Sequence, residues 1–151
     1  MTQNKPSNTT THTETIRARG HEHVRAAHSS TFEVTSDDWL TPAGDCILGV
    51  DADRVPADFS DAFVAAAKQP TTVITATIAT DTHSQTITGR GDPELSFAGD
   101  RSAVGRTSEY VDDRTIMVGA DAAAKTVNRE LVAELQEGCE FTLTLQVRTD
   151  D

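Results

Sequence analysis

The chain has 151 residues, 36% of them hydrophobic, and a formal net charge of −11 at pH 7. At this size folding buries roughly 68–70% of the surface of the unfolded chain, which is enough for one domain with its own core. No run approaches the ~18 apolar residues that a membrane span needs, and Cys46 and Cys139 follow no disulfide or metal spacing, so the sequence excludes a membrane-spanning protein and a disulfide scaffold and predicts a cytoplasmic location.

The N-terminal segment is polar and has no periodic apolar residues. Its sequence, "MTQNKPSNTTTH", offers little to bury, so residues 1–13 are predicted as a disordered tail and residues 14–151 as a single globular domain. Residues 15–20 and 31–35 are rich in Thr and branched side chains, which predicts strands. The apolar run "CILGV", residues 46–50, predicts a strand buried on both faces.

The middle of the chain predicts one helix and one hairpin. Residues 58–69, "DFSDAFVAAAKQ", place apolar side chains at helical spacing; Asp58 or Ser60 can cap the start, and Pro70 ends the helix. Residues 71–89, "TTVITATIATDTHSQTITG", alternate apolar and polar side chains around a polar bend, which predicts two paired strands.

The C-terminal part predicts a second helix followed by a strand. Residues 121–137 carry apolar side chains that step by four along one face, and Gly138 can supply a left-handed C-cap. Residues 141–148 alternate strictly between apolar and polar side chains, as in a strand with one face in the core. The pattern as a whole predicts an α+β fold, mainly β, with antiparallel sheets in a β-sandwich-like domain with two flanking helices.

The charged residues are biased in kind as well as in sign. Asp outnumbers Glu 15 to 9, Arg outnumbers Lys 10 to 3, and Thr occurs 23 times. This composition is typical of a haloarchaeal protein, in which acidic side chains hold hydrated cations at the surface. At molar salt the Debye length is about 3 Å, so a loose basic patch would bind little, and we expect any functional site to be a shielded pocket.

Three histidines lie close together in the sequence before the second predicted strand. His21 and His23 would share one face of an extended segment, and His28 can return to them across a bend. Imidazoles of this kind suit zinc or another transition metal, so His21 and His28 are candidate metal ligands. The alternative is that they are ordinary polar residues in a loop.

Arginines occur in the same stretch. Arg17 and Arg19 share one strand face, and with Arg25 they present rigid guanidinium forks that suit a phosphate or a carboxylate. Arg114 lies among acidic residues further along the chain, where it can pair with an acid or line a pocket. Ion pairs that neutralise neighbouring acids remain the alternative for all four.

Cys46 stands where a glycine-containing turn leads into a predicted buried strand. Together with Asp45 and His28 it has the residue types of a nucleophile, an orienting acid and a base. A buried, unreactive core thiol is the alternative interpretation.

Five blocks of the sequence carry a resemblance to a known family. They are "ARGHEHVRAAHSSTFEVT", "LTPAGDCILGVDAD", "GRGDPEL", "RTSEYVDDRTIMVGADAAA" and "RELVAEL", and they cover nearly everything after the tail. With them the chain resembles an archaeal family known as domain of unknown function three-seventy-one, here as a haloarchaeal-type member. The resemblance implies a compact, mainly β domain similar to a sandwich and implies no activity.

The resemblance also marks polar positions and two departures. The polar residues and glycines that match it are Gly20, His21, Arg25, His28, Gly44, Asp45, Cys46, Ser108, Arg114, Thr115 and Asp121. His23 stands where the family has Asn, which counts against a metal pair of His21 and His23. Asp92 stands where the family has His, which puts a role for "GRGDP" in doubt.

These observations lead to three hypotheses about function. The first is binding of an anionic ligand, such as a phosphorylated metabolite, a nucleotide or an RNA phosphate, by His21, Arg25, His28 and Arg114. The second is a metal- or Cys-dependent enzyme that uses the same pocket, with Cys46, Asp45 and His28 as catalytic residues. The third is a structural or regulatory subunit that contacts a partner protein. The sequence assigns no cofactor and no oligomeric state.

Overall fold

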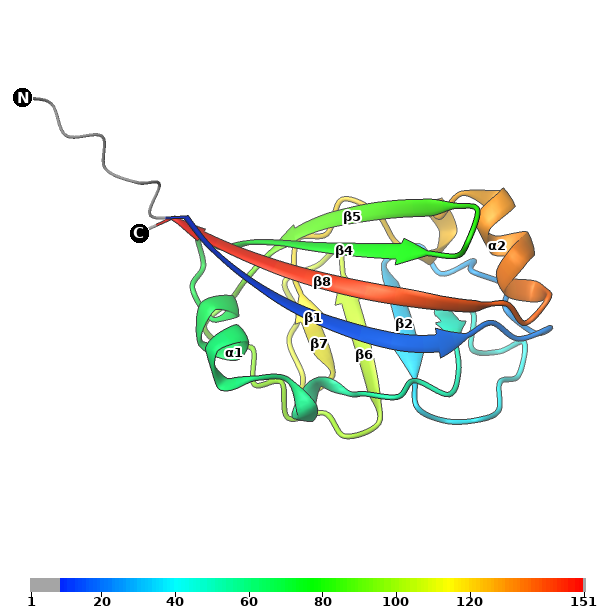
Figure 1. Ribbon diagram of the computed structural model, residues 1–151, viewed down its shortest axis with the longest axis horizontal. Helices are drawn as coiled ribbons and strands as arrows, with labels where there is room; N and C mark the ends of the chain where they lie inside the picture. The colour runs from blue at the N-terminus through cyan, green and yellow to red at the C-terminus, as the bar shows by residue number, and fades with distance from the viewer. Residues whose placement is uncertain (1–8, 151) are drawn as a thin grey trace, which may run out of the picture.

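The computed structural model describes residues 9–150, which form two four-stranded sheets arranged as two layers with crossing strands (Figure 1). The first sheet has the strand order β1-β8-β4-β5, and all its neighbouring strands are antiparallel. Its strands are β1 (Thr9–Arg19), β8 (Glu140–Asp150), β4 (Val73–Ala79) and β5 (Ser84–Arg90).

β1 begins earlier than the sequence predicted. Every residue from Thr9 to Arg19 pairs with a residue of β8. Thr11 and Thr13 are exposed, and threonine is well suited to the solvent side of a strand, so the polar composition does not prevent pairing. Residues 9–13 of the predicted tail therefore belong to the strand, whereas residues 1–8 lie outside the described part of the chain.

The second sheet is mixed rather than antiparallel. Its order is β3-β2-β6-β7; β2 and β6 are antiparallel, but β3 is parallel to β2 and β7 is parallel to β6. The strands are β2 (Thr31–Thr35), β3 (Ile47–Gly49), β6 (Ser102–Arg106) and β7 (Thr115–Met117). Two connections, residues 36–46 and residues 107–114, carry the chain back to the end of the sheet at which the preceding strand began. The next strand therefore runs parallel to the preceding one.

The two sheets are joined at both edges by short backbone bridges. Arg19 at the end of β1 exchanges hydrogen bonds of 3.0 and 2.8 Å with Val50, and Arg90 of β5 exchanges bonds of 2.9 and 3.1 Å with Val118. These bridges satisfy backbone groups that an open sheet edge would expose. The two layers consequently form a nearly closed, flattened barrel.

One continuous core fills the space between the sheets. The alternating apolar side chains of β8, from Phe141 to Val147, are buried against Phe32 of β2 and Leu48 of β3, as the sequence pattern predicted for the last strand. Ile74, Ala76 and Ile78 of β4 point to the same core, which confirms the predicted hairpin with its inner face.

The first predicted helix is present and short. α1 (Asp61–Ala67) follows the 3-10 turn η1 (Pro56–Asp58), and the Ser60 hydroxyl accepts a hydrogen bond of 3.1 Å from the Phe63 N–H. Ser60 is thus the N-cap, one of the two caps that the sequence offered. The buried carboxylate of Glu14 accepts from the Ser60 N–H at 2.7 Å and pairs with Arg54 at 2.6 Å, which ties the helix start to β1.

The second predicted helix is shorter than its apolar periodicity indicated. α2 (Arg129–Gln136) begins only after Asn128, whose side-chain oxygen accepts from the backbone N–H groups of Glu130 and Leu131. The preceding residues form the 3-10 turn η2 (Ala124–Thr126). Asp121, the predicted helix start, instead accepts a hydrogen bond of 3.0 Å from the Thr88 N–H of β5.

The chain is therefore an α+β protein, mainly β, and its two helices flank the sheets at opposite ends (Figure 1). Within residues 9–150, no helix has both the length and the apolarity to cross a membrane.

Candidate functional site

The outer side of the second sheet carries a polar cluster at its centre. Phe32 and Val34 point into the core, so Glu33 between them points outward. The Cys46 thiol donates a hydrogen bond of 3.3 Å to the Glu33 carboxylate. Burial and the adjacent negative charge of Glu33 raise the pKa of Cys46 to about 12, so the neutral thiol predominates at physiological pH.

The three predicted catalytic residues lie in adjacent segments but do not form a nucleophile–base pair. The backbone carbonyl of Asp45 accepts from the N–H groups of Ala27 and His28 at 2.9 and 3.2 Å. His28 uses its Nδ1 atom to accept from the backbone N–H groups of Ser30 and Thr31, so the neutral imidazole carries its proton on Nε2. The thiol of Cys46 faces Glu33 rather than this imidazole.

His21 and Arg25 make contacts of their own. The Nδ1 atom of His21 accepts from the His23 N–H at 3.0 Å, and the two rings lie 5.2 Å apart. The Nη1 group of Arg25 donates to the Pro42 carbonyl at 3.4 Å. Within residues 9–150 no group of three or more His, Cys, Asp or Glu side chains is arranged to hold a metal ion. No third ligand is therefore in place beside the predicted pair of His21 and His28.

Arg114 belongs to a chain of linked charges. Its guanidinium donates to Asp112 at 2.9 Å, and Arg106 donates to the same carboxylate at 3.0 Å. Burial opposes ionisation of Asp112, but the hydrogen bonds and charges of the two guanidiniums outweigh it and lower the pKa of Asp112 to about 2. Arg106 is 9% exposed, and its guanidinium carbon lies 4.8 Å from the centre of the Tyr110 ring.

A cavity of about 400 Å³ opens beside this cluster. We call it the Trp39 cavity; its lining includes Glu33, Asp37, Trp39, Leu40, Arg101 and Arg114. Trp39 is 56% exposed. Arg101 donates to Asp37 through Nε and Nη2, at 3.0 and 2.8 Å. The Nη1 groups of Arg101 and Arg114 make no hydrogen bond to the described residues, so their N–H donors remain available to a ligand.

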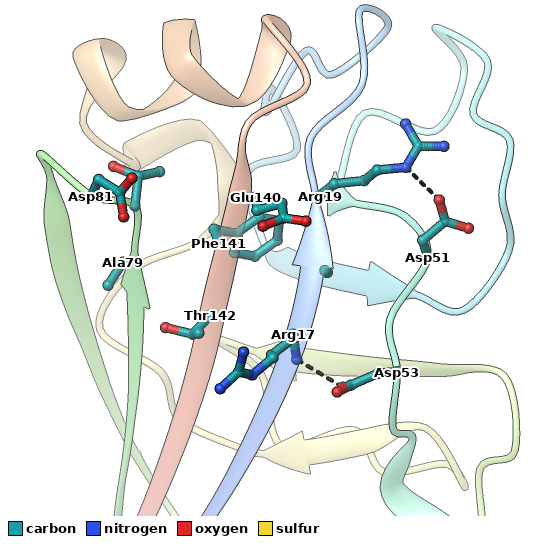
Figure 2. Close-up of a pocket in the computed structure, with 11 residues that line it drawn as sticks. Arg17, Arg19, Asp51, Asp53, Ala79, Asp81, Glu140, Phe141 and Thr142 are labelled. Carbon is teal, nitrogen blue, oxygen red and sulfur yellow. Dashed lines mark hydrogen bonds and ion pairs between the residues drawn. The ribbon is translucent and has the colours of Figure 1, made fainter.

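A larger cavity, of about 550 Å³, lies on the outer side of the first sheet (Figure 2). Its charged lining residues are Arg17, Arg19, Asp51, Asp53, Asp81 and Glu140. Arg19 pairs with Asp51, and the backbone N–H of Arg17 donates to Asp53 at 2.8 Å (Figure 2). Because carboxylates outnumber guanidiniums here, this cavity repels an anion, although Arg17 and Arg19 share a face as predicted.

The sequence reasoning missed three residues of the Trp39 cavity. Glu33 could have been found from the alternation in "TFEVT", which places it opposite two core residues. Trp39 is the one tryptophan of the chain and stands in the turn-rich stretch "DDWLTPAGD", where a large exposed ring is a signal of a binding surface. Arg101 gave no local signal, because only the tertiary fold brings it to Asp37.

These features define a class of protein: a mainly β domain that carries a half-open polar cavity and an exposed tryptophan over a mixed sheet. The chain belongs to the family described as "Domain of unknown function (DUF371)", whose model matches residues 16–148. It is also similar to an uncharacterized protein of Methanocaldococcus jannaschii, with 39% identity over 132 residues that make up 87% of this chain and 97% of that relative. The predicted archaeal family is confirmed.

Proposed function

We propose that the protein binds an anionic ligand that contains an aromatic ring, of the nucleotide class, in the Trp39 cavity. The observation that carries this proposal is the placement of an exposed indole, 56% accessible, in one cavity with Arg101 and Arg114. An aromatic base can stack on the indole, and its phosphate can meet the two guanidiniums.

The energetics of the cavity favour a ligand with both parts. Stacking of a base on an aromatic side chain contributes about 1–3 kcal/mol and does not depend on salt in the way that ion pairs do. Arg101 and Arg114 are oriented by Asp37 and Asp112, so little side-chain entropy is lost when their Nη1 groups bind a phosphate. Glu33 provides an acceptor for an amino group on the base.

The predicted ligand residues contribute to this site unequally. Arg114 lines the cavity directly. His28 is connected to it through Thr31, whose hydroxyl lies 3.1 Å from the imidazole and also interacts with Cys46. Arg25 bonds to Pro42 in the segment that forms the cavity wall. His21 makes no contact that links it to the cavity among the described residues.

The enzymatic alternative has weaker support. A nucleophilic Cys46 needs a thiolate, and the raised pKa of this thiol opposes one. A role as a structural or regulatory subunit is the remaining alternative, because an exposed tryptophan also suits a protein partner. Absence of nucleotide binding would favour that role.

The natural fluorescence of the chain provides the test. Trp39 is the single tryptophan, so its emission reports on this cavity without any label. We expect adenosine and guanosine monophosphates to quench the emission saturably, at low and at molar KCl, and inorganic phosphate to have little effect. Arg114→Gln should weaken nucleotide binding about tenfold, whereas Arg17→Gln, in the other cavity, should not. Failure of every nucleotide to quench, or normal binding by Arg114→Gln, would overturn the proposal.

A further inference from the structure

A second exposed aromatic ring lies on the same side of the molecule as the Trp39 cavity. Tyr110, in the segment 107–114 over the second sheet, is 61% exposed. Arg106 lies 4.8 Å from its ring centre, so the guanidinium holds the ring in place by a cation–π contact. Among the described residues, Trp39 and Tyr110 are the only aromatic side chains that are largely exposed.

A continuous line of hydrogen-bonded side chains connects this ring to the cavity. Arg106, beside Tyr110, shares the Asp112 carboxylate with Arg114, which lines the Trp39 cavity. Taken with the cavity, Arg101, Arg106 and Arg114 are balanced by Glu33, Asp37 and Asp112, so this line offers guanidinium N–H donors without excess positive charge. Two strands separate these groups across the sheet. Glu33 in the cavity and Thr115, which accepts from Arg106, both pair with Val104, so their backbones lie about 10 Å apart.

A mononucleotide that stacks on Trp39 leaves the Tyr110 ring unused. Two or more linked nucleotides can stack one base on each ring and place the connecting phosphate along the guanidiniums between them. Exposed rings interleaved with arginines on the outer side of a sheet are the usual means of binding single strands.

We infer that the ligand of this site is a single-stranded oligonucleotide, held by base stacking on Trp39 and Tyr110. This inference rests on the proposed function and extends it from a nucleotide to a strand. The net charge of −11 repels a polyanion at long range, so binding depends on the stacked rings rather than on the overall field, and added salt screens the repulsion.

The test compares ligand lengths on the full chain. Quenching of Trp39 is titrated with a mononucleotide, a dinucleotide and a hexanucleotide of the same base, the hexanucleotide as RNA and as DNA, at low and at molar KCl. We expect the hexanucleotide to bind at least tenfold more tightly than the mononucleotide. Tyr110→Ala should remove most of that gain, roughly tenfold, and leave mononucleotide binding unchanged, while Tyr110→Phe, which keeps the ring, should bind as the wild type does.

The outcomes separate the two proposals. If no nucleotide of any length quenches Trp39, the proposed function fails. If the mononucleotide binds as tightly as the hexanucleotide, or if Tyr110→Ala leaves hexanucleotide binding intact, only the inference about a strand is wrong. Tighter binding of either the RNA or the DNA hexanucleotide supports the inference and identifies which sugar the site prefers. Circular dichroism of each variant establishes that it is folded.

Discussion

The thiol of Cys46 donates a hydrogen bond to the carboxylate of Glu33, with 3.3 Å between Sγ and Oε1. Burial and this carboxylate raise the pKa of Cys46 to about 12. We expect Cys46 to react slowly with iodoacetamide up to pH 10, and Glu33→Gln to accelerate the reaction because it removes the negative charge. The rate is measured as a function of pH in a Cys139→Ala background. Full reactivity near pH 9, as for a free thiol, would show that the Cys46 thiol is not buried beside the Glu33 carboxylate.

The tip of the β4–β5 hairpin is attached to α2 by a pH-sensitive contact. His83 contacts Glu134 at 2.5 Å and Glu130 at 3.0 Å. The hydrogen bonds with Glu134 and Glu130 raise the pKa of His83, and hydrogen bonds from Thr82, Thr80 and His83 lower that of Glu134 despite partial burial.

The raised pKa of His83 stabilises the fold fully below about pH 6.5, and the contribution is lost as the pH rises through the folded-state value. The lowered pKa of Glu134 stabilises it above about pH 4.3, with loss as the pH falls through the folded-state value. We expect the melting temperature to fall between pH 6 and pH 9 by more in the wild type than in His83→Gln. Thermal scans at both pH values measure this difference, and parallel profiles would show that the contact does not affect stability.

The buried carboxylate of Glu14 couples β1 to the start of α1. It pairs with Arg54 at 2.6 Å and accepts from the Ser60 N–H at 2.7 Å. Glu14→Ala removes the carboxylate partner of the Arg54 guanidinium, which is only 33% exposed. We expect this change to lower the free energy of unfolding by about 3 kcal/mol. Glu14→Gln keeps an acceptor for Ser60 and should lose less. Urea titrations give both values; equal losses would show that the acceptor kept by Gln adds nothing and that the negative charge accounts for the whole effect.

Two glycines at α2 have different physical roles. A side chain at Gly20 would collide with the backbone carbonyl of Leu135, whereas one at Gly138 would meet nothing within 4 Å. Gly138 instead has a φ of +83°, the left-handed C-cap conformation predicted from the sequence. We expect Gly20→Ala to cost about 3 kcal/mol and Gly138→Ala about 1 kcal/mol. Denaturant titration measures both losses of stability. A larger loss for Gly138→Ala than for Gly20→Ala would contradict the close contact between Gly20 and Leu135.

Much of the fold could be predicted from the local sequence pattern, because these strands and helices bury one face and expose the other. The alternation in β8 and in the β4–β5 hairpin, and the Ser60 cap, follow from period and capping chemistry. The helix start at residue 121 was wrong, because apolar spacing continues through η2 while the Asn128 cap fixes where helical hydrogen bonding begins.

The candidate site was only partly accessible from sequence. Arg114, Cys46 and Asp45 were singled out because of residue type and position in a turn or beside a predicted strand, and they lie around one region of the second sheet. Which carboxylate each group meets depends on the loops that cross the sheet. Neither the Glu33 partner of Cys46 nor the Asp37 partner of Arg101 has a signal in local sequence.

The pairing of β1 with β8 joins the first strand of the described chain to the last one along eleven residues each. During synthesis β8 leaves the ribosome after β2 to β7 and both helices, so β1 has no β8 partner until all of these intervening elements have been made. Non-local pairing of this kind slows folding. We expect the nascent chain to lack its first sheet until β8 has left the ribosome, and to depend in that interval on cellular factors that cover exposed β1 and β4.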